Sequence, residues 1–163
     1  MIRFKSAKYT IEAPLLVGAL AGGVPEAALP ALSDYGLALG EAFQLRDDLL
    51  GVFGSPQQTG KPAGDDLREG KRTVLLAYAL DAADAEATET IGALVGRADL
   101  GTEGVEQLRA ILARGGAVDR VEADIASLAA AARSALAVAA PALDPTAALV
   151  LGELVEVCTA RDS

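Results

Sequence analysis

Apolar residues recur at intervals of three and four along most of the chain, the spacing that gathers them on one face of an α-helix. This pattern predicts a first helix over about residues 4–20, bent at Pro14, and a second over 25–53, bent near Pro30. Further helices are predicted at 71–83, 86–97, 103–114, 117–140 and 146–160. No segment shows the alternation typical of a strand. We therefore expect an all-α fold.

The stretch between the second and third predicted helices has the composition of a loop. It reads GSPQQTGKPAGDDLREG over residues 54–70, and glycine, proline and small polar residues make up most of it. Gly54 and Pro56 end the preceding helix in the usual order. Glycines further along allow the backbone to approach a ligand closely; they are Gly60, Gly64 and Gly70.

Composition narrows the class of protein. The 163 residues are 52% hydrophobic, which suits a single domain over 1–163 with a substantial core. The only cysteine, Cys158, excludes an intramolecular disulfide and indicates a reducing compartment, so we expect a cytoplasmic protein. We expect no secretory signal, because the sequence does not open with a basic segment, an apolar run and a cleavage site of small residues. The apolar run 134–143 is too short to cross a bilayer and contains a proline, so we expect no integral membrane segment.

Charge and residue types exclude several functions. With no histidine and one cysteine, zinc sites and histidine-based acid–base catalysis are close to excluded. The net charge of −9 argues against nucleic acid and anionic membranes as partners. All four lysines lie within the first 72 residues, where eight basic residues face nine acidic ones, against six and fourteen afterwards. This distribution fits either a local anion site or a chance cluster of solvated lysines.

The segment FQLRDDLLGVFG, residues 43–54, contains two adjacent acids among apolar and small residues. On a helix, Gln44, Asp47, Asp48 and Gly51 fall within one arc of about 100°. The rest of this helix is apolar nearly all round, which favours an enclosed cavity in front of the acids. The alternative is an amphipathic helix with its acids in bulk water. Arg46, on the apolar side, needs a partner that the sequence does not identify.

Two ionised carboxylates in one cavity require a compensating cation. Neighbouring oxygen ligands suit Mg²⁺, which is usually held by one or two carboxylates together with waters and substrate phosphates. The loop that follows supplies Lys61 and Lys71 as point charges for a phosphate, and Lys5 with Ser6 adds a cation and a hydroxyl. Together these residues predict a diphosphate site bridged by Mg²⁺, although lysines in a glycine-rich loop are often only solvated.

The ordered set of motifs is more specific than its parts. KSAKYT, GALAGG, GEAFQLRDDLLGVFG and TGKPAGDDLREGKRT follow one another along the chain. This order resembles the C-terminal half of the trans-isoprenyl diphosphate synthases, or polyprenyl synthetases. The sequences of these motifs are most similar to those of the geranylgeranyl-type enzymes of actinobacteria. The resemblance covers essentially the whole chain and is strongest between residues 5 and 73.

The resemblance implies an isoprenoid synthase-type helical bundle, here incomplete, around a deep apolar cavity. It implies that Asp47 and Asp48 begin the second Asp-rich motif and hold Mg²⁺. The residues it assigns to catalysis are Lys5, Gln44, Asp47 and Asp48. The residues it assigns to the substrate diphosphate are Lys5, Ser6, Gln44, Lys61 and Lys71. Asp66 matches the acid five positions before the last lysine, and Gly51 stands where many relatives carry a third aspartate.

The implied reaction joins an allylic diphosphate to isopentenyl diphosphate. Positive charge stabilises the departing diphosphate, and the double bond of isopentenyl diphosphate attacks the allylic cation. Loss of a proton then completes the elongation. Water must be kept from the cation, so the apolar cavity is part of the chemistry.

The family's first Asp-rich motif and the basic residues that hold isopentenyl diphosphate have no counterpart in this sequence. Asp65 and Asp66 form the only other acid pair, and they belong to the loop after the second motif. One hypothesis is a partial prenyltransferase chain that is inactive by itself. The alternative is a complementing or non-catalytic subunit of a split or heteromeric synthase. Half a bundle leaves an apolar face open, so we expect a homo-oligomer or a partner chain to cover it.

Overall fold

The computed structural model describes residues 3–56, 60, 62 and 64–159, with side chains from residue 7 onward. Every regular element among these residues is a helix, and no strand occurs in the described ranges. The all-α prediction is therefore confirmed. The contacts divide the chain into two compact units, one within residues 1–46 and 124–162, the other within 47–123. The single domain expected from the sequence stays a prediction.

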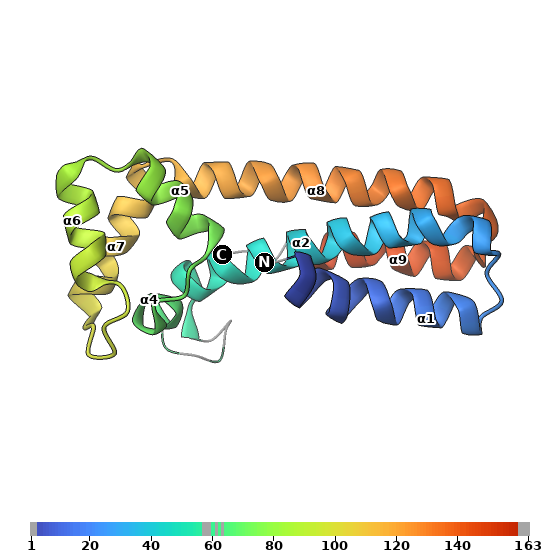
Figure 1. The fold of residues 1–163 in the computed structure, drawn as a ribbon, viewed down its shortest axis with the longest axis horizontal. Helices are drawn as coiled ribbons and strands as arrows, with labels where there is room; N and C mark the ends of the chain where they lie inside the picture. Colours follow the sequence, from blue (N-terminus) through green and yellow to red (C-terminus); the bar gives the residue numbers. More distant parts are fainter. Residues whose placement is uncertain (1–2, 57–59, 61, 63, 160–163) are drawn as a thin grey trace. The chain divides into compact units, whose positions relative to one another are not determined.

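The first unit is built from long helices that run alongside one another (Figure 1). It contains the π-helix η1 (Arg3–Glu12), α1 (Ala13–Ala21), the short 3-10 helices η2 (Glu26–Ala28) and η3 (Ala140–Ala142), and α9 (Pro145–Thr159). It also contains most of α2 (Leu29–Phe53) and of α8 (Ala117–Ala139). Its core joins α2, α8 and α9 through six buried residues, which are Tyr35, Leu39, Ala129, Ala132, Leu136 and Val155.

Two glycines of α2 bring the first helical segment close to it. A Cβ on Gly40 would lie 2.5 Å from the Cα of Ala7, and one on Gly36 would lie 2.9 Å from the Cα of Glu12. Both distances are shorter than real Cβ contacts, so the close approach requires glycine. Gly36 and Gly40 therefore let α2 and η1 pack backbone to backbone.

Arg46 has the partner that the sequence did not identify. Its Nε donates a hydrogen bond of 3.0 Å to the backbone oxygen of Thr159 at the end of α9. The side chain is buried. The last carbonyls of a helix have no partner within it, and a guanidinium there is favourable both as a donor and as a positive charge. Arg46 therefore stabilises the C-terminal end of α9.

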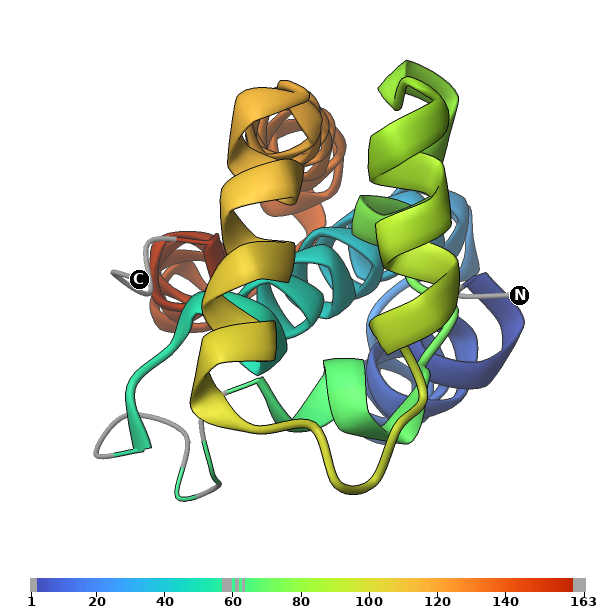
Figure 2. The same cartoon turned by 90° about the vertical axis from the view of Figure 1, so that its left-hand side faces the viewer.

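Among its described residues, the second unit comprises four shorter helices and the adjoining ends of α2 and α8. These helices are α4 (Asp65–Glu69), α5 (Val74–Ala82), α6 (Ala85–Leu94) and α7 (Thr102–Arg114). The pair α6 and α7 stand side by side (Figure 2). Arg109 of α7 donates from Nε to the backbone oxygen of Val52 at 2.7 Å, and so stabilises the end of α2.

The observed helices agree with the predicted ones to within a few residues, apart from α4, which lies in the segment predicted as a loop. Among the described residues, the stretch Ala117–Ala142 is long and apolar enough to cross a membrane by length and composition alone. The run 134–143 overlaps the end of this longer stretch. One such helix is weak evidence, because the core helix of a soluble protein passes the same test.

Candidate functional site

The adjacent acids Asp47 and Asp48 occupy the last two turns of α2 and differ in their surroundings. The side chain of Asp48 is 3% exposed, and that of Asp47 is 53% exposed. Neighbouring residues on a helix point about 100° apart, which accounts for the difference. Asp48 is therefore buried, and the expectation that both acids face an enclosed cavity does not describe the exposed Asp47.

Lys71 supplies the positive charge that the buried acid requires. Its Nζ lies 2.9 Å from Oδ2 of Asp66, 3.1 Å from Oδ1 of Asp48 and 3.9 Å from Oδ2 of Asp47. Burial alone would lower the pKa of Lys71, but the hydrogen bonds to Asp66 and Asp48 and their negative charges outweigh it and hold that pKa above its ordinary value. Lys71 therefore stays protonated at neutral pH.

Glycines on either side of α4 determine the path of the backbone that leads to Lys71. Gly64 precedes the helix with φ of 74°, and Gly70 follows it with φ of 67°, a conformation that favours glycine. A Cβ on Gly70 would lie 2.9 Å from the Cα of Gly96, so the two backbones meet closely. Thr73 then caps α5 by accepting from the amide of Leu76. Lys71 thus occupies a short connection held at both ends.

The structure describes the remaining predicted site residues to different extents. Gln44 lies on α2, three residues before Asp47, and is half-buried. The backbone of Lys5 and Ser6 belongs to η1, whose Ala7 packs against Gly40, but their side chains lie outside the described part. Lys61 lies outside the described residues. Of the three lysines predicted for the diphosphate, Lys71 is therefore the one whose contacts with the acid pair are described.

The donor set fits a partial shell for Mg²⁺. Two neighbouring carboxylates are a usual protein contribution to such a site, and the side chain of Asp47 is largely open to solvent. Within the described ranges, no group of three or more histidine, cysteine or acidic side chains is placed to hold a metal by itself. Two carboxylates completed by waters and phosphate oxygens are therefore the arrangement that these residues fit.

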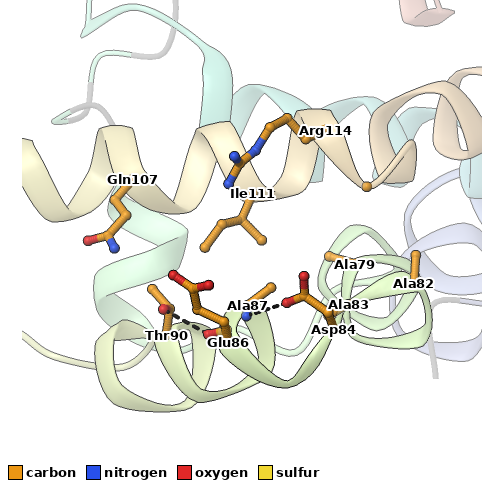
Figure 3. A pocket seen from close by; sticks show the side chains of 11 residues that line it. Ala79, Ala82, Ala83, Asp84, Glu86, Ala87, Thr90, Gln107, Ile111 and Arg114 are labelled. Carbon is orange, nitrogen blue, oxygen red and sulfur yellow. Dashed lines mark hydrogen bonds between the residues drawn. The ribbon is translucent and has the colours of Figure 1, made fainter.

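A separate hollow of about 330 Å³ lies between α6 and α7 in the second unit (Figure 3). Ile111 and Arg114 of α7 face Asp84 and Thr90 across it. Asp84 already accepts from the amide of Ala87, and Thr90 donates to the backbone oxygen of Glu86. These two polar groups serve α6 itself and indicate no chemistry at this hollow.

Comparison with known proteins places the chain in a family. The family model described as polyprenyl synthetase matches residues 1–112, more than half of the sequence. The chain belongs to the polyprenyl synthetase family. The resemblance inferred from the motifs between residues 5 and 73 is thereby confirmed. The matched range includes Asp47, Asp48, Asp66 and Lys71.

Relatives of this polyprenyl synthetase chain include prenyl diphosphate synthases of several organisms. It is 38% identical over 126 residues to a geranylgeranyl diphosphate synthase of Mycobacterium tuberculosis, covering 72% of this chain and 36% of the relative. It is 38% identical over 123 residues to a geranylfarnesyl diphosphate synthase of Aeropyrum pernix, covering 75% of this chain and 37% of the relative.

A solved structure shares its fold. A geranylgeranyl pyrophosphate synthase of Corynebacterium glutamicum, complexed with isoprenyl diphosphate and magnesium, matches with a TM-score of 0.91 and 43% identity. The match covers 98% of this chain and 45% of that chain. The polyprenyl synthetase chain described here thus spans less than half the length of these relatives. The isoprenyl diphosphate synthase fold expected from the motifs is confirmed.

Proposed function

We propose that this chain supplies the second acidic site of a prenyl diphosphate synthase, which elongates an allylic diphosphate with isopentenyl diphosphate. The observation that carries the proposal is Lys71 placed within 3.1 Å of Asp48, next to the solvent-exposed carboxylate of Asp47. Family membership and the magnesium and isoprenyl diphosphate bound by the Corynebacterium relative support the same assignment. The first acidic site would come from polypeptide outside this sequence.

Each predicted site residue has a role in this proposal. Asp47 and Asp48 hold Mg²⁺, which supplies positive charge to the diphosphate when bound. Lys71 has three N–H donors, of which Asp66 and Asp48 take two, and its side chain is 37% exposed. The third donor is available to a diphosphate oxygen, where negative charge develops as the allylic C–O bond breaks. Lys5, Ser6, Gln44 and Lys61 complete the diphosphate contacts.

The proposal is tested in a chimera that joins this chain to the N-terminal part of the Corynebacterium relative. We expect the chimera to elongate an allylic diphosphate with radiolabelled isopentenyl diphosphate. Asp47→Asn should lower kcat by about 100-fold or more, because the Mg²⁺ that stabilises negative charge on the departing diphosphate would lose a ligand. The fold should be retained, since Asp47 is largely exposed.

Asp34→Asn is the matched control, because Asp34 is an exposed acid on the same helix. It should leave kcat unchanged. Equal activity of the Asp47→Asn and Asp34→Asn chimeras would overturn the role of the acid pair. The unmodified chain by itself should show no elongation, and turnover by that chain would contradict the requirement for a first acidic site.

The alternative function, a complementing subunit, has its own support in the first unit. Large apolar side chains are exposed on α1 and α9, namely Val17, Leu20, Leu149, Val150, Leu154 and Val157. A groove of about 690 Å³, lined mainly by small and apolar residues of α1 and α9, lies on the same unit. Exposed apolar surface of this kind marks contact sites. We propose that a second copy or a partner chain covers it.

Sedimentation velocity measures whether that surface is covered. We expect the purified chain to sediment as a dimer or larger species. Val157→Asp should shift it towards the monomer, because a charge in an apolar contact is costly. Glu153→Asp, a conservative change on the same helix, serves as the control. A monodisperse monomer of the unmodified chain would contradict the proposal.

A further inference from the structure

The space that a side chain at Gly51 would fill is occupied by the side chain of Asp66. A Cβ built on Gly51 would lie 2.3 Å from Oδ2 of Asp66, 2.5 Å from its Cγ and 3.0 Å from its Oδ1. The first two distances are shorter than real Cβ contacts, and the third is tighter than most of them. The carboxylate of Asp66 therefore rests directly on the backbone of α2, and any side chain at position 51 would push it away.

The same carboxylate holds Lys71. Oδ2 of Asp66 accepts a hydrogen bond of 2.9 Å from Nζ of Lys71, the shortest of the three contacts that this ammonium makes with acids. Asp66 is buried, with 9% of its side chain exposed. The void beside Asp66 and Lys71 is only about 10 Å³. Close packing and a charge-assisted hydrogen bond together leave Lys71 little freedom.

We propose that Asp66 is a positioning residue that takes the place of a missing side chain at Gly51 and fixes the ammonium of Lys71 against Asp48. Asp47, Asp48 and Asp66 then form a three-carboxylate cluster, two members from α2 and one from α4, with Lys71 among them. The functional meaning of this cluster rests on the proposed role of Lys71 towards a diphosphate. Gly51 and Asp66 are a complementary pair, since the absence of one side chain makes room for the other.

The rate at which Lys71 is acetylated reports whether its amine is held. The full chain is treated with an N-hydroxysuccinimide acetate at one pH, and modification of Lys71 relative to exposed Lys8 is measured by peptide mass spectrometry. Asp66→Ala should raise this ratio by about tenfold, the factor expected when one charge-assisted hydrogen bond is lost. Gly51→Ala should raise it similarly, because the added Cβ displaces Asp66.

Two further variants separate positioning from a purely structural role. Asp66→Asn keeps the shape and removes the charge, so it should raise the ratio by a few fold while the unfolding midpoint stays near that of the unmodified chain. The double variant Gly51→Asp with Asp66→Ala moves the third carboxylate onto α2 and should return the ratio to within about threefold of the unmodified chain. Asp65→Ala, on the same short helix, is the control and should change nothing.

The outcomes are separable. An unchanged ratio in both Asp66→Asn and Asp66→Ala would overturn the proposal, as would a Gly51→Ala variant that folds and labels like the unmodified chain. The expected labelling pattern with an inactive chimera would instead overturn the proposed function and leave Asp66 as the residue that holds Lys71.

Discussion

Replacing Gly40 with alanine is expected to lower the free energy of unfolding by about 3 kcal/mol, the upper end of the range for overpacked cores. The added Cβ would lie 2.5 Å from the Cα and 2.6 Å from the Cβ of Ala7. Ala7 is fully buried and its atoms cannot rotate away, so η1 and α2 must separate. This loss exceeds the gain of about 0.5–1 kcal/mol that alanine brings to a helix interior. Urea unfolding measures the difference.

Gly18→Ala is the control for this substitution. Gly18 lies inside α1 in the same unit, and nothing lies within 4 Å of a Cβ placed on it. Alanine there should stabilise the chain by about 0.5–1 kcal/mol. If Gly40→Ala stabilised the chain as much as Gly18→Ala, the close packing of η1 on α2 would be wrong.

Lys71→Met is expected to lower the free energy of unfolding by about 3 kcal/mol, the lower end of the range for a broken buried ion pair. Asp48 and Asp66 would lose the ammonium that lies within 3.1 Å of both, and their side chains are 3% and 9% exposed. The lower end applies because Lys71 itself is 37% exposed, so water can partly replace it. The midpoint of thermal unfolding and urea titration both measure the effect.

Arg72→Met provides the comparison, since it removes one positive charge from the neighbouring exposed position. It should change the free energy of unfolding by no more than about 0.5 kcal/mol. Similar losses for the two variants would indicate that net charge matters and that the contacts of Lys71 with Asp48 and Asp66 do not.

Helical periodicity predicted most of the fold because each long helix buries one face. Periodicity did not predict the five-residue helix α4, because it is shorter than two turns and lies among glycines and prolines that indicate turns. The partner of Arg46 escaped it for another reason. Thr159 is 113 residues further along, and a helix end that needs a donor leaves no mark in the periodicity around Arg46.

The candidate site was predictable in its residue types and less so in its geometry. Adjacent acids with following lysines indicated a charged cluster, and Nζ of Lys71 lies 3.1 Å from Oδ1 of Asp48. The sequence did not separate buried Asp48 from exposed Asp47, because the arc around the helix contained both. Asp66 was noted only as a family match. The signal that could have found it is the glycine at position 51, which leaves space for a side chain from elsewhere.

The core of the first unit has a consequence for how the chain can be divided. The family signature ends at residue 112, yet Ala129, Ala132, Leu136 and Val155 lie beyond it and cover Tyr35 and Leu39. A fragment that ends at residue 112 would keep the cluster of Asp47, Asp48, Asp66 and Lys71. It would lose the residues of α8 and α9 that bury Tyr35 and Leu39 of α2. In this chain, the residues that match the family model therefore include only part of the core that packs around α2.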